Sequence, residues 1–295
     1  MNVAKLLLVF VLWALCFPLI EVGRSDVPPL MFATLRALLA GAVLLAIAVA
    51  LKRPWPKTPR LWLSVVLIGI GATSLGFWGM FEAARWVSPG LATVVANAQP
   101  LVAALLAAIY LKEKLSMTIL IGLAGGFAGI ALIAFPSLRV GGAEGQAVGF
   151  IFLAIAMLGI TGSNVLIKRS ARDIDPLVMM GLQLLIGAIP LGLAVPLLEG
   201  DRAINFSSTF VIVLVILALP GTALAYWLWT DVLRTVELSR AIAFSFLVPV
   251  IGLLLGWAFF DEQLSAMTLL GALTVIGGLA VANWPKQESR YDGTR

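Results

Sequence analysis

Amide, hydroxyl and aromatic side chains recur inside the long apolar segments of this sequence. Amides are costly in lipid, so these side chains should face the interior of a helix bundle. One interpretation is a polar, largely uncharged pocket that suits a small zwitterion with an apolar or aromatic side chain. The other is a set of hydrogen bonds between helices. The pocket residues would be Phe17, Trp78, Asn97, Gln99, Ser163, Asn164, Tyr226, Trp227 and Ser245, with Thr161, Gln183 and Thr222 at similar depth.

Two prolines stand near the middle of their apolar segments. Pro100 and Pro249 each follow about 11 segment residues, which places them near the bilayer centre at 1.5 Å per residue. Each removes one N–H donor and frees the carbonyl four residues earlier, at Ala96 and Ser245. A free carbonyl at this depth must face protein or a cavity. The prolines are therefore either simple kinks or hinges whose carbonyls accept a hydrogen bond from a substrate ammonium.

A tryptophan, an acid and an arginine recur with one spacing in two places. At positions i, i+4 and i+7 the three side chains share one face of a helix. The pattern indicates either interfacial tryptophans with local ion pairs or a pair of gates that seal opposite ends of a path. The residues are Trp78, Glu82 and Arg85 in the first copy, and Trp227, Asp231 and Arg234 in the second.

Arg36 lies about eight residues inside its apolar segment. Three roles remain open for it: it extends outward to the membrane surface, it pairs with Glu82, or it binds a substrate carboxylate. Glu113 and Glu262 follow apolar segments and precede Ser116 and Ser265, which resemble helix N-caps. A carboxylate beside a helix N-terminus satisfies free N–H groups, so both glutamates are interpreted as structural.

Several kinds of chemistry have no residues to support them. The chain has no histidine and one cysteine, Cys16, which excludes an intrachain disulfide. It has no phosphate-binding loop, no metal-ligand cluster and no nucleophile elbow. We expect no cofactor, no bound metal and no enzymatic activity.

Composition assigns the chain to the membrane. Of 295 residues, 61% are hydrophobic and 12% are charged, whereas a soluble domain carries about 25% charged residues. The basic balance then reflects the connecting loops rather than a nucleic-acid partner. An apolar run of about 20 residues crosses a bilayer. The sequence predicts ten such spans, at 4–22, 29–51, 61–84, 89–111, 117–135, 146–168, 176–198, 209–233, 240–260 and 265–284.

The basic residues of the connections are strongly biased to one side. Fifteen Lys and Arg lie on the side of both termini, and four, Arg24, Arg85, Arg139 and Arg202, lie on the other. Because cytoplasmic loops carry the excess of Lys and Arg, both termini are predicted in the cytoplasm.

The chain repeats itself. Residues 75–131 align without gaps on residues 224–280, with 15 identities in 57 positions, including Pro100 on Pro249 and Glu113 on Glu262. We predict a first repeat at 1–140, a second at 146–285 and a cytoplasmic tail at 286–295. Five spans per repeat make the halves inverted, an architecture typical of secondary transporters. The predicted fold class is an all-α integral membrane protein of two inverted five-helix repeats.

These motifs resemble a known family. The proline-centred segments that end in Leu111-Lys112-Glu113-Lys114-Leu115-Ser116 and Phe260-Asp261-Glu262-Gln263-Leu264-Ser265 are similar to the signature of the EamA domain, in the drug/metabolite transporter superfamily. Segments around Trp13-…-Phe17-Pro18 and Leu35-Arg36-Ala37 resemble its first two helices. Lys112 and Asp261 replace a usual glycine, and Gln183 replaces the arginine in the second copy. The resemblance implies a transporter of five plus five helices, and within the family a likeness to YddG-type amino-acid exporters.

The expected function is export of small metabolites, amino acids above all, across the inner membrane by alternating access. A multidrug or nucleotide-sugar carrier of the same superfamily is the alternative, although only Arg36 lies inside a span to bind a diphosphate. A membrane scaffold without transport is the third hypothesis. The expected partners are a small-molecule substrate and the lipid bilayer, with the chain as a monomer or a homodimer.

Overall fold

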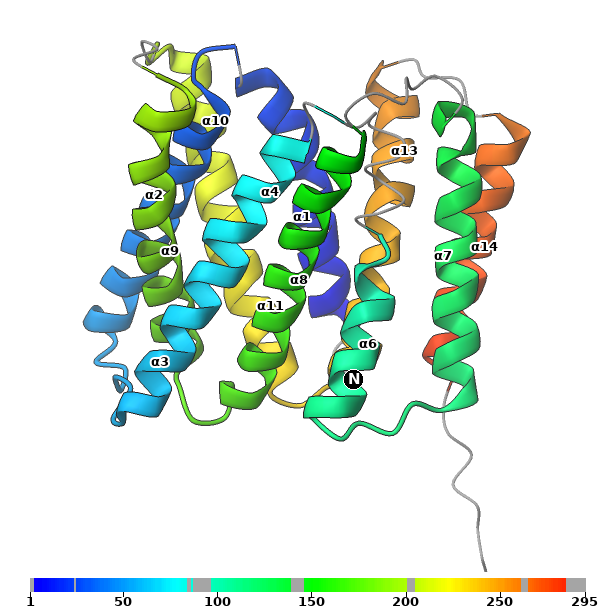
Figure 1. Cartoon of the computed structure of the whole chain (residues 1–295), viewed down its shortest axis with the longest axis horizontal. Helices are drawn as coiled ribbons and strands as arrows, with labels where there is room; N and C mark the ends of the chain where they lie inside the picture. Colours follow the sequence, from blue (N-terminus) through cyan, green and yellow to red (C-terminus); the bar gives the residue numbers. More distant parts are fainter. Residues whose placement is uncertain are drawn as a thin grey trace, which may run out of the picture.

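Long apolar runs fold into helices in a bilayer because a helix satisfies every backbone polar group within the segment. A computed structural model (Figure 1) describes residues 3–23, 25–83, 86, 97–138, 146–200, 205–260 and 265–284. The first half contains α1 (Val3–Gly23), α2 (Pro29–Ala50), α3 (Pro59–Ile68), η1 (Gly69–Leu75), α4 (Gly76–Ala83), α6 (Gln99–Tyr110) and α7 (Met117–Leu138). The second half contains α8 (Gln146–Ser170), α9 (Pro176–Leu198), α10 (Ser208–Ala218), η2 (Leu219–Leu224), α11 (Ala225–Leu233), α12 (Leu238–Ala243), η3 (Phe244–Phe246), α13 (Leu247–Phe260) and α14 (Ala266–Ala282).

Each of the ten predicted spans contains helix within its described residues. In the part of the chain that the structure describes, eight helical stretches are long and apolar enough to cross a membrane, and α6 and α14 are shorter apolar helices. The fourth predicted span, 89–111, is described only from residue 97 onward. The prediction of an all-α membrane protein with two five-helix repeats is confirmed. The N-terminus lies at the end of the bundle drawn at the bottom of Figure 1, here called the basic end.

Two segments wind as π-helices at equivalent places in the two repeats. The η1 segment at Gly69–Leu75 interrupts the third span, and η2 at Leu219–Leu224 interrupts the eighth. Residues 70–75 align on 219–224 by the offset of 149 that relates the repeats. A π-helical turn inside an α-helix occurs frequently at functional sites. Its recurrence here places a π-helical departure from regular α-helix at matching positions of the two repeats.

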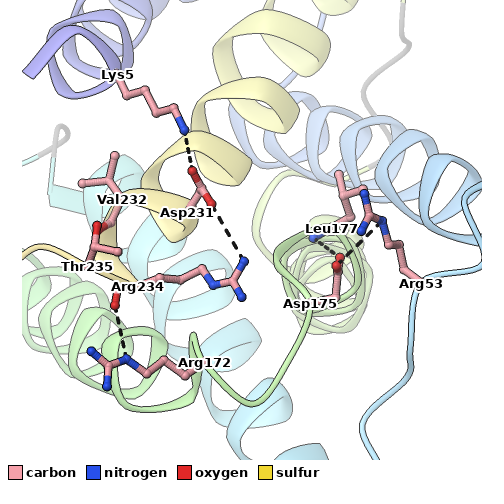
Figure 2. Close-up of polar contacts among 9 residues, drawn as sticks. All are labelled: Lys5, Arg53, Arg172, Asp175, Leu177, Asp231, Val232, Arg234 and Thr235. Carbon is pink, nitrogen blue, oxygen red and sulfur yellow. Dashed lines mark hydrogen bonds and ion pairs between the residues drawn. The ribbon is translucent and has the colours of Figure 1, made fainter. Parts of the chain in front are cut away.

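Helices α2 and α9 pack against each other in opposite directions. At one end, the Glu199 carboxylate that follows α9 accepts hydrogen bonds from the backbone N–H groups of Leu30 (2.7 Å) and Met31 (3.1 Å) at the start of α2. At the other end, Asp175 caps Leu177 at the start of α9, and Arg53, which follows α2, lies 3.9 Å from the Asp175 carboxylate (Figure 2). The start of each helix of the pair is therefore held by a residue at the end of the other.

Helices α7 and α14 form a second antiparallel pair, at the right of Figure 1. A Cβ atom built on Gly122 lies 2.5 Å from the carbonyl oxygen of Gly278, and one built on Gly129 lies 2.6 Å from that of Gly271. Gly122 and Gly271 are repeat equivalents, as are Gly129 and Gly278. The contact is thus made twice, once in each direction, as expected for inverted repeats related by a pseudo-two-fold axis. These glycines serve packing within the chain.

Adjacent glycines of α14 allow a matched test of this packing. We expect Gly278→Ala to lower the melting temperature of the purified protein, because its Cβ would lie 2.6 Å from the Gly126 nitrogen and backbone cannot yield locally. Overpacking of this kind costs about 1–3 kcal/mol. Gly277→Ala is the control, since a Cβ there meets nothing within 4 Å. Equal melting temperatures for both variants in detergent would contradict the reciprocal glycine contact.

Candidate functional site

Arg36 joins four helical segments from both repeats. It lies on α2, and its Nε donates a hydrogen bond to the Thr222 hydroxyl of η2 at 2.6 Å. One Nη lies 3.9 Å from the Cys16 sulfur of α1. The guanidinium carbon lies 5.5 Å from the centre of the Phe77 ring of α4, within cation–π range. The side chain therefore extends into the bundle and not outward to the membrane surface, the first of the three roles considered for it.

Arg36 has no carboxylate partner among the residues that the structure describes. Within the residues that the structure describes, Arg36 contacts a hydroxyl, a thiol and a ring, and no carboxylate lies within 4.0 Å of its guanidinium. Pairing with Glu82 is therefore not among its contacts. Charged side chains inside a membrane are costly and usually face a partner or a substrate path. A half-buried guanidinium without a carboxylate can bind an anionic group of a ligand.

The second repeat contains the neutral counterpart of this contact. Thr73 of η1 donates a hydrogen bond to the Gln183 side-chain oxygen of α9 at 2.9 Å. Thr73 aligns on Thr222 by the offset of 149, and Arg36 aligns on Gln183 by the offset of 147. In each repeat the threonine of the π-helix therefore contacts the equivalent position of the other repeat. Thr222 contacts the charged Arg36, and Thr73 contacts the neutral Gln183. Thr73 was absent from the predicted site, although the repeat alignment pairs it with a predicted residue.

Aromatic rings lie near the Arg36 charge. Tyr226 of α11 follows Thr222, the residue that Arg36 contacts, by four positions. Its ring packs edge-on against Trp13 of α1 at 5.8 Å between centroids. Tyr226 and Trp227 are both half-buried, as predicted pocket residues should be, and both border the main apolar core. The side chain of Phe17 lies outside the described part of the structure. Charge, hydroxyl and aromatic rings are thus brought together by α1, α2, α4, η2 and α11.

The indole N–H of Trp78 has no acceptor in the part of the chain that the structure describes. Its ring packs edge-on against Phe152 at 5.3 Å and borders the apolar cluster of Leu30, Leu191 and Val195. Among the described residues, its indole N–H is buried and no acceptor reaches it. A buried donor without an acceptor costs free energy in the resting structure. Trp78 is therefore a candidate donor to a ligand or to another conformation of the bundle.

Other predicted pocket residues form hydrogen bonds between helices. Asn164 accepts a hydrogen bond from the Trp229 indole at 3.0 Å, and the Ser163 hydroxyl donates to the Ile68 carbonyl at 3.3 Å. For these two residues the contacts agree with the structural interpretation left open by the sequence. Asn97, which has a partner, is half-buried, as are Gln99 and Ser245.

The two prolines begin helical segments. The prediction placed Pro100 in the middle of a continuous helix, but α6 begins at Gln99 and its preceding residues 97–98 form a turn. Pro249 is the third residue of α13, which follows the short 3₁₀ turn η3. Proline is compatible with the first turn of a helix because the N–H it lacks would have no intrahelical partner there. The ninth span is thus interrupted just before Pro249, and the described helix of the fourth span begins at Gln99. A role of either proline as a hinge remains a proposal.

The acid and arginine of the second repeated motif form ion pairs at the basic end. Asp231 accepts a 2.6 Å salt bridge from Lys5, and the Arg234 guanidinium lies 3.9 Å from the other carboxylate oxygen (Figure 2). Lys5 belongs to the first repeat and Asp231 to the second, so this pair joins the halves. In the first copy, Glu82 lies on α4 and has a partner, whereas Arg85 lies outside the described residues.

Glu113 also joins the halves at this end. Its carboxylate accepts hydrogen bonds from the backbone N–H of Leu238 (2.7 Å), the backbone N–H of Ser239 (3.1 Å) and the Ser239 hydroxyl (2.7 Å). It therefore caps α12 of the other repeat, not the helix that follows it in sequence. Its repeat equivalent, Glu262, lies outside the described residues. Ser265 caps α14 through the Thr268 N–H at 3.1 Å, as predicted.

Comparison with known proteins identifies the family. The EamA-like transporter family matches residues 2–135 and again residues 147–284. The chain is 32% identical over 286 residues to a protein of Salmonella typhimurium named "Probable amino-acid metabolite efflux pump", covering 93% of this chain and 92% of that protein. It is 26% identical over 267 residues to a chloroplastic WAT1-related protein of Arabidopsis thaliana, covering 88% of this chain and 63% of that protein.

A solved crystal structure shares the fold. It matches with a TM-score of 0.80 at 24% identity, covering 95% of this chain and 95% of the other. The family and its efflux-pump relative are transporters and not enzymes. The double match agrees with the paired η1 and η2 contacts and with the antiparallel helix pairs. The chain is a multi-pass membrane transporter that belongs to the EamA-like family of the drug/metabolite transporter superfamily.

Proposed function

We propose that this transporter exports small metabolites that carry a carboxylate, amino acids above all, across the inner membrane. The observation that supports this substrate class is the Arg36 guanidinium, half-buried in the bundle without a carboxylate among the described residues. A substrate carboxylate would supply the missing anion through charge-assisted hydrogen bonds. The aromatic rings of Phe77, Trp13 and Tyr226 nearby favour an apolar or aromatic substrate side chain. The name of the Salmonella relative agrees with this class.

The rest of the site is assigned by position. The proposed substrate contacts are those predicted from sequence, Phe17, Trp78, Asn97, Gln99, Ser163, Asn164, Tyr226, Trp227 and Ser245. Arg36 would bind the carboxylate, and the Trp78 indole is a further donor. A cationic drug is disfavoured because Arg36 would repel it, and a nucleotide sugar would need more basic groups for its diphosphate than the one arginine at this depth.

Transport would proceed by alternating access between residues 1–140 and 146–285, with both termini in the cytoplasm. Contacts between the halves hold both ends of the bundle. Glu113 caps α12 at the basic end, and Glu199 caps α2 at the other. Because a carboxylate on one half binds backbone N–H groups of the other, opening either end must break one such set. Pro100 and Pro249, in the first turns of α6 and α13, are the proposed hinges, and Glu82, Arg85, Asp231 and Arg234 are the proposed gates.

Efflux from cells tests the direction and the substrate class together. Bacterial cells that express the protein would be loaded with dipeptides, which release amino acids inside, and the medium would be sampled over time. We expect faster appearance of one group of amino acids in the medium than from cells carrying an empty vector. Unchanged efflux of every amino acid, from cells whose membranes contain the folded protein, would contradict the proposal.

A further inference from the structure

The buried Thr222 hydroxyl of η2 lies between two partners. It donates its one proton to the Leu217 carbonyl, five residues earlier in the chain, at 2.8 Å. Its oxygen accepts the hydrogen bond from the Arg36 Nε at 2.6 Å. A guanidinium donates hydrogen bonds and accepts none, so this contact requires the hydroxyl proton to point elsewhere. The Leu217 carbonyl therefore holds the hydroxyl in the orientation that Arg36 needs.

The equivalent threonine of the first repeat has the opposite orientation. Thr73 donates its proton to the Gln183 side-chain oxygen at 2.9 Å. Ile68 aligns on Leu217 by the offset of 149, and its carbonyl accepts instead from the Ser163 hydroxyl at 3.3 Å. A side chain of the other repeat thus binds that carbonyl, and the threonine proton goes to the glutamine.

A difference between the repeats in sequence accompanies this difference in orientation. Cys16 aligns on Ser163 by the offset of 147. Its thiol contacts backbone carbonyls of α1 and η2 at 3.3 and 3.8 Å, and a thiol is a weaker donor than a hydroxyl. In the part of the chain that the structure describes, no side chain of the other repeat binds the Leu217 carbonyl, which is left to Thr222.

The contacts of Arg36 leave one edge of its guanidinium for a ligand. Nε and Nη2 form one edge, and it faces Thr222 at 2.6 Å and Cys16 at 3.9 Å. The guanidinium carbon lies over the Phe77 ring at 5.5 Å. Among the described residues, no acceptor contacts Nη1. The edge formed by Nη1 and Nη2 is therefore the one that can donate two parallel hydrogen bonds to a carboxylate.

We propose that Thr222 is a positioning residue for substrate binding, because it holds Arg36 through Nε and so directs the Nη1–Nη2 edge to the substrate carboxylate. This role rests on the proposed function, since it requires that Arg36 bind a carboxylate. A side chain that is already held loses less conformational freedom when a ligand binds. Thr222 thus raises the affinity for the anion by acting through Arg36.

Competition between free acids and their amides tests this role in vesicles that contain only the purified protein. The labelled amino acid with the fastest saturable uptake is the probe, and phenylalanine with phenylalaninamide is the first pair of competitors. Thr222→Val keeps nearly the same shape and removes the hydroxyl. It should lower the preference for the acid over the amide by about 3- to 10-fold, the range of one net hydrogen bond, with the maximal rate unchanged.

Two further variants separate positioning from packing. Thr222→Ser restores the hydroxyl and should restore the preference for the acid. Thr73→Val is the matched control, because it removes the equivalent hydroxyl, which contacts Gln183 and not Arg36. This control should keep the preference, whatever its melting temperature. If Thr222→Val does not fold, Thr222→Cys gives the same comparison, since a thiol is a weak acceptor.

The outcomes distinguish this role from the proposed function. Loss of the preference in Thr222→Val and Arg36→Gln, with retention in Thr222→Ser and Thr73→Val, supports the positioning role. Loss in Arg36→Gln alone, or equal loss in Thr222→Val and Thr73→Val, overturns the role and leaves the proposed function in place. No saturable uptake of any amino acid, no preference for the acid in wild type, or full preference in Arg36→Gln overturns both.

Discussion

Arg36→Gln is expected to weaken the apparent affinity for a carboxylate substrate by about 10- to 150-fold, the loss of one charged hydrogen-bonded contact. Glutamine is the informative replacement because Gln183 already occupies the equivalent position of the other repeat and bonds Thr73 there. In the variant, both π-helical threonines would face a glutamine, and the Thr222 hydroxyl would still have a hydrogen-bond partner. Because Arg36 is half-buried and has no carboxylate partner among the described residues, removing its charge should leave the melting temperature unchanged or higher. The measurement is KM for uptake into vesicles that contain only this protein.

Its control is Gln183→Ala, which removes the neutral contact to Thr73. This variant should lose stability and keep its affinity for the carboxylate, since no charge is lost. Arg36→Lys retains the charge without the planar fork and should fall between wild type and glutamine. If Arg36→Gln transports with an unchanged KM, the arginine does not bind the substrate.

Glu113→Ala is expected to destabilise the folded protein by about 2–4 kcal/mol, because it removes a charged cap and leaves backbone donors without an acceptor. Glu237, the residue at the N-cap position of α12, forms no capping hydrogen bond through its side chain. The three hydrogen bonds of Glu113 therefore carry the start of this helix. Thermal unfolding in detergent should show a melting temperature lower by several degrees.

Lys114→Ala provides the comparison, since Lys114 is the exposed neighbour of Glu113 and should leave the melting temperature unchanged. Glu113→Gln keeps one acceptor oxygen without the charge and should be intermediate. Identical unfolding of Glu113→Ala and Lys114→Ala would show that the carboxylate does not hold α12.

The helices were predictable because their signals are local in the sequence. Segments such as 29–51 and 176–198 could be predicted from their apolar length and from the prolines and capping residues beside them. They match α2 and α9 within a residue. The inverted arrangement followed from the repeat, since five spans must reverse the direction of the second half. These features depend on composition and spacing, both of which the sequence contains in full.

The contacts of the site were less predictable. No residue pattern predicts a π-helix, so η1 and η2 could not be placed from the sequence. Without these segments, nothing distinguishes Thr73 from other buried threonines. Three roles for Arg36 fitted the sequence equally, because its reach to Thr222 depends on how two distant helices pack. Glu113 was expected to be structural, but the helix that it caps is set by the tertiary fold. The cap that Glu199 places on α2 was not expected from the sequence.

Isotope counterflow in vesicles containing only the purified protein tests the central claim most directly. Vesicles would be loaded with one unlabelled amino acid at a time, and uptake of its labelled form would be followed. The proposed carrier predicts saturable uptake for one group of amino acids, inhibited by the free acids and not by their amides, which lack the carboxylate that Arg36 would bind. Absence of uptake for every amino acid from folded protein, or equal inhibition by the amides, would contradict it.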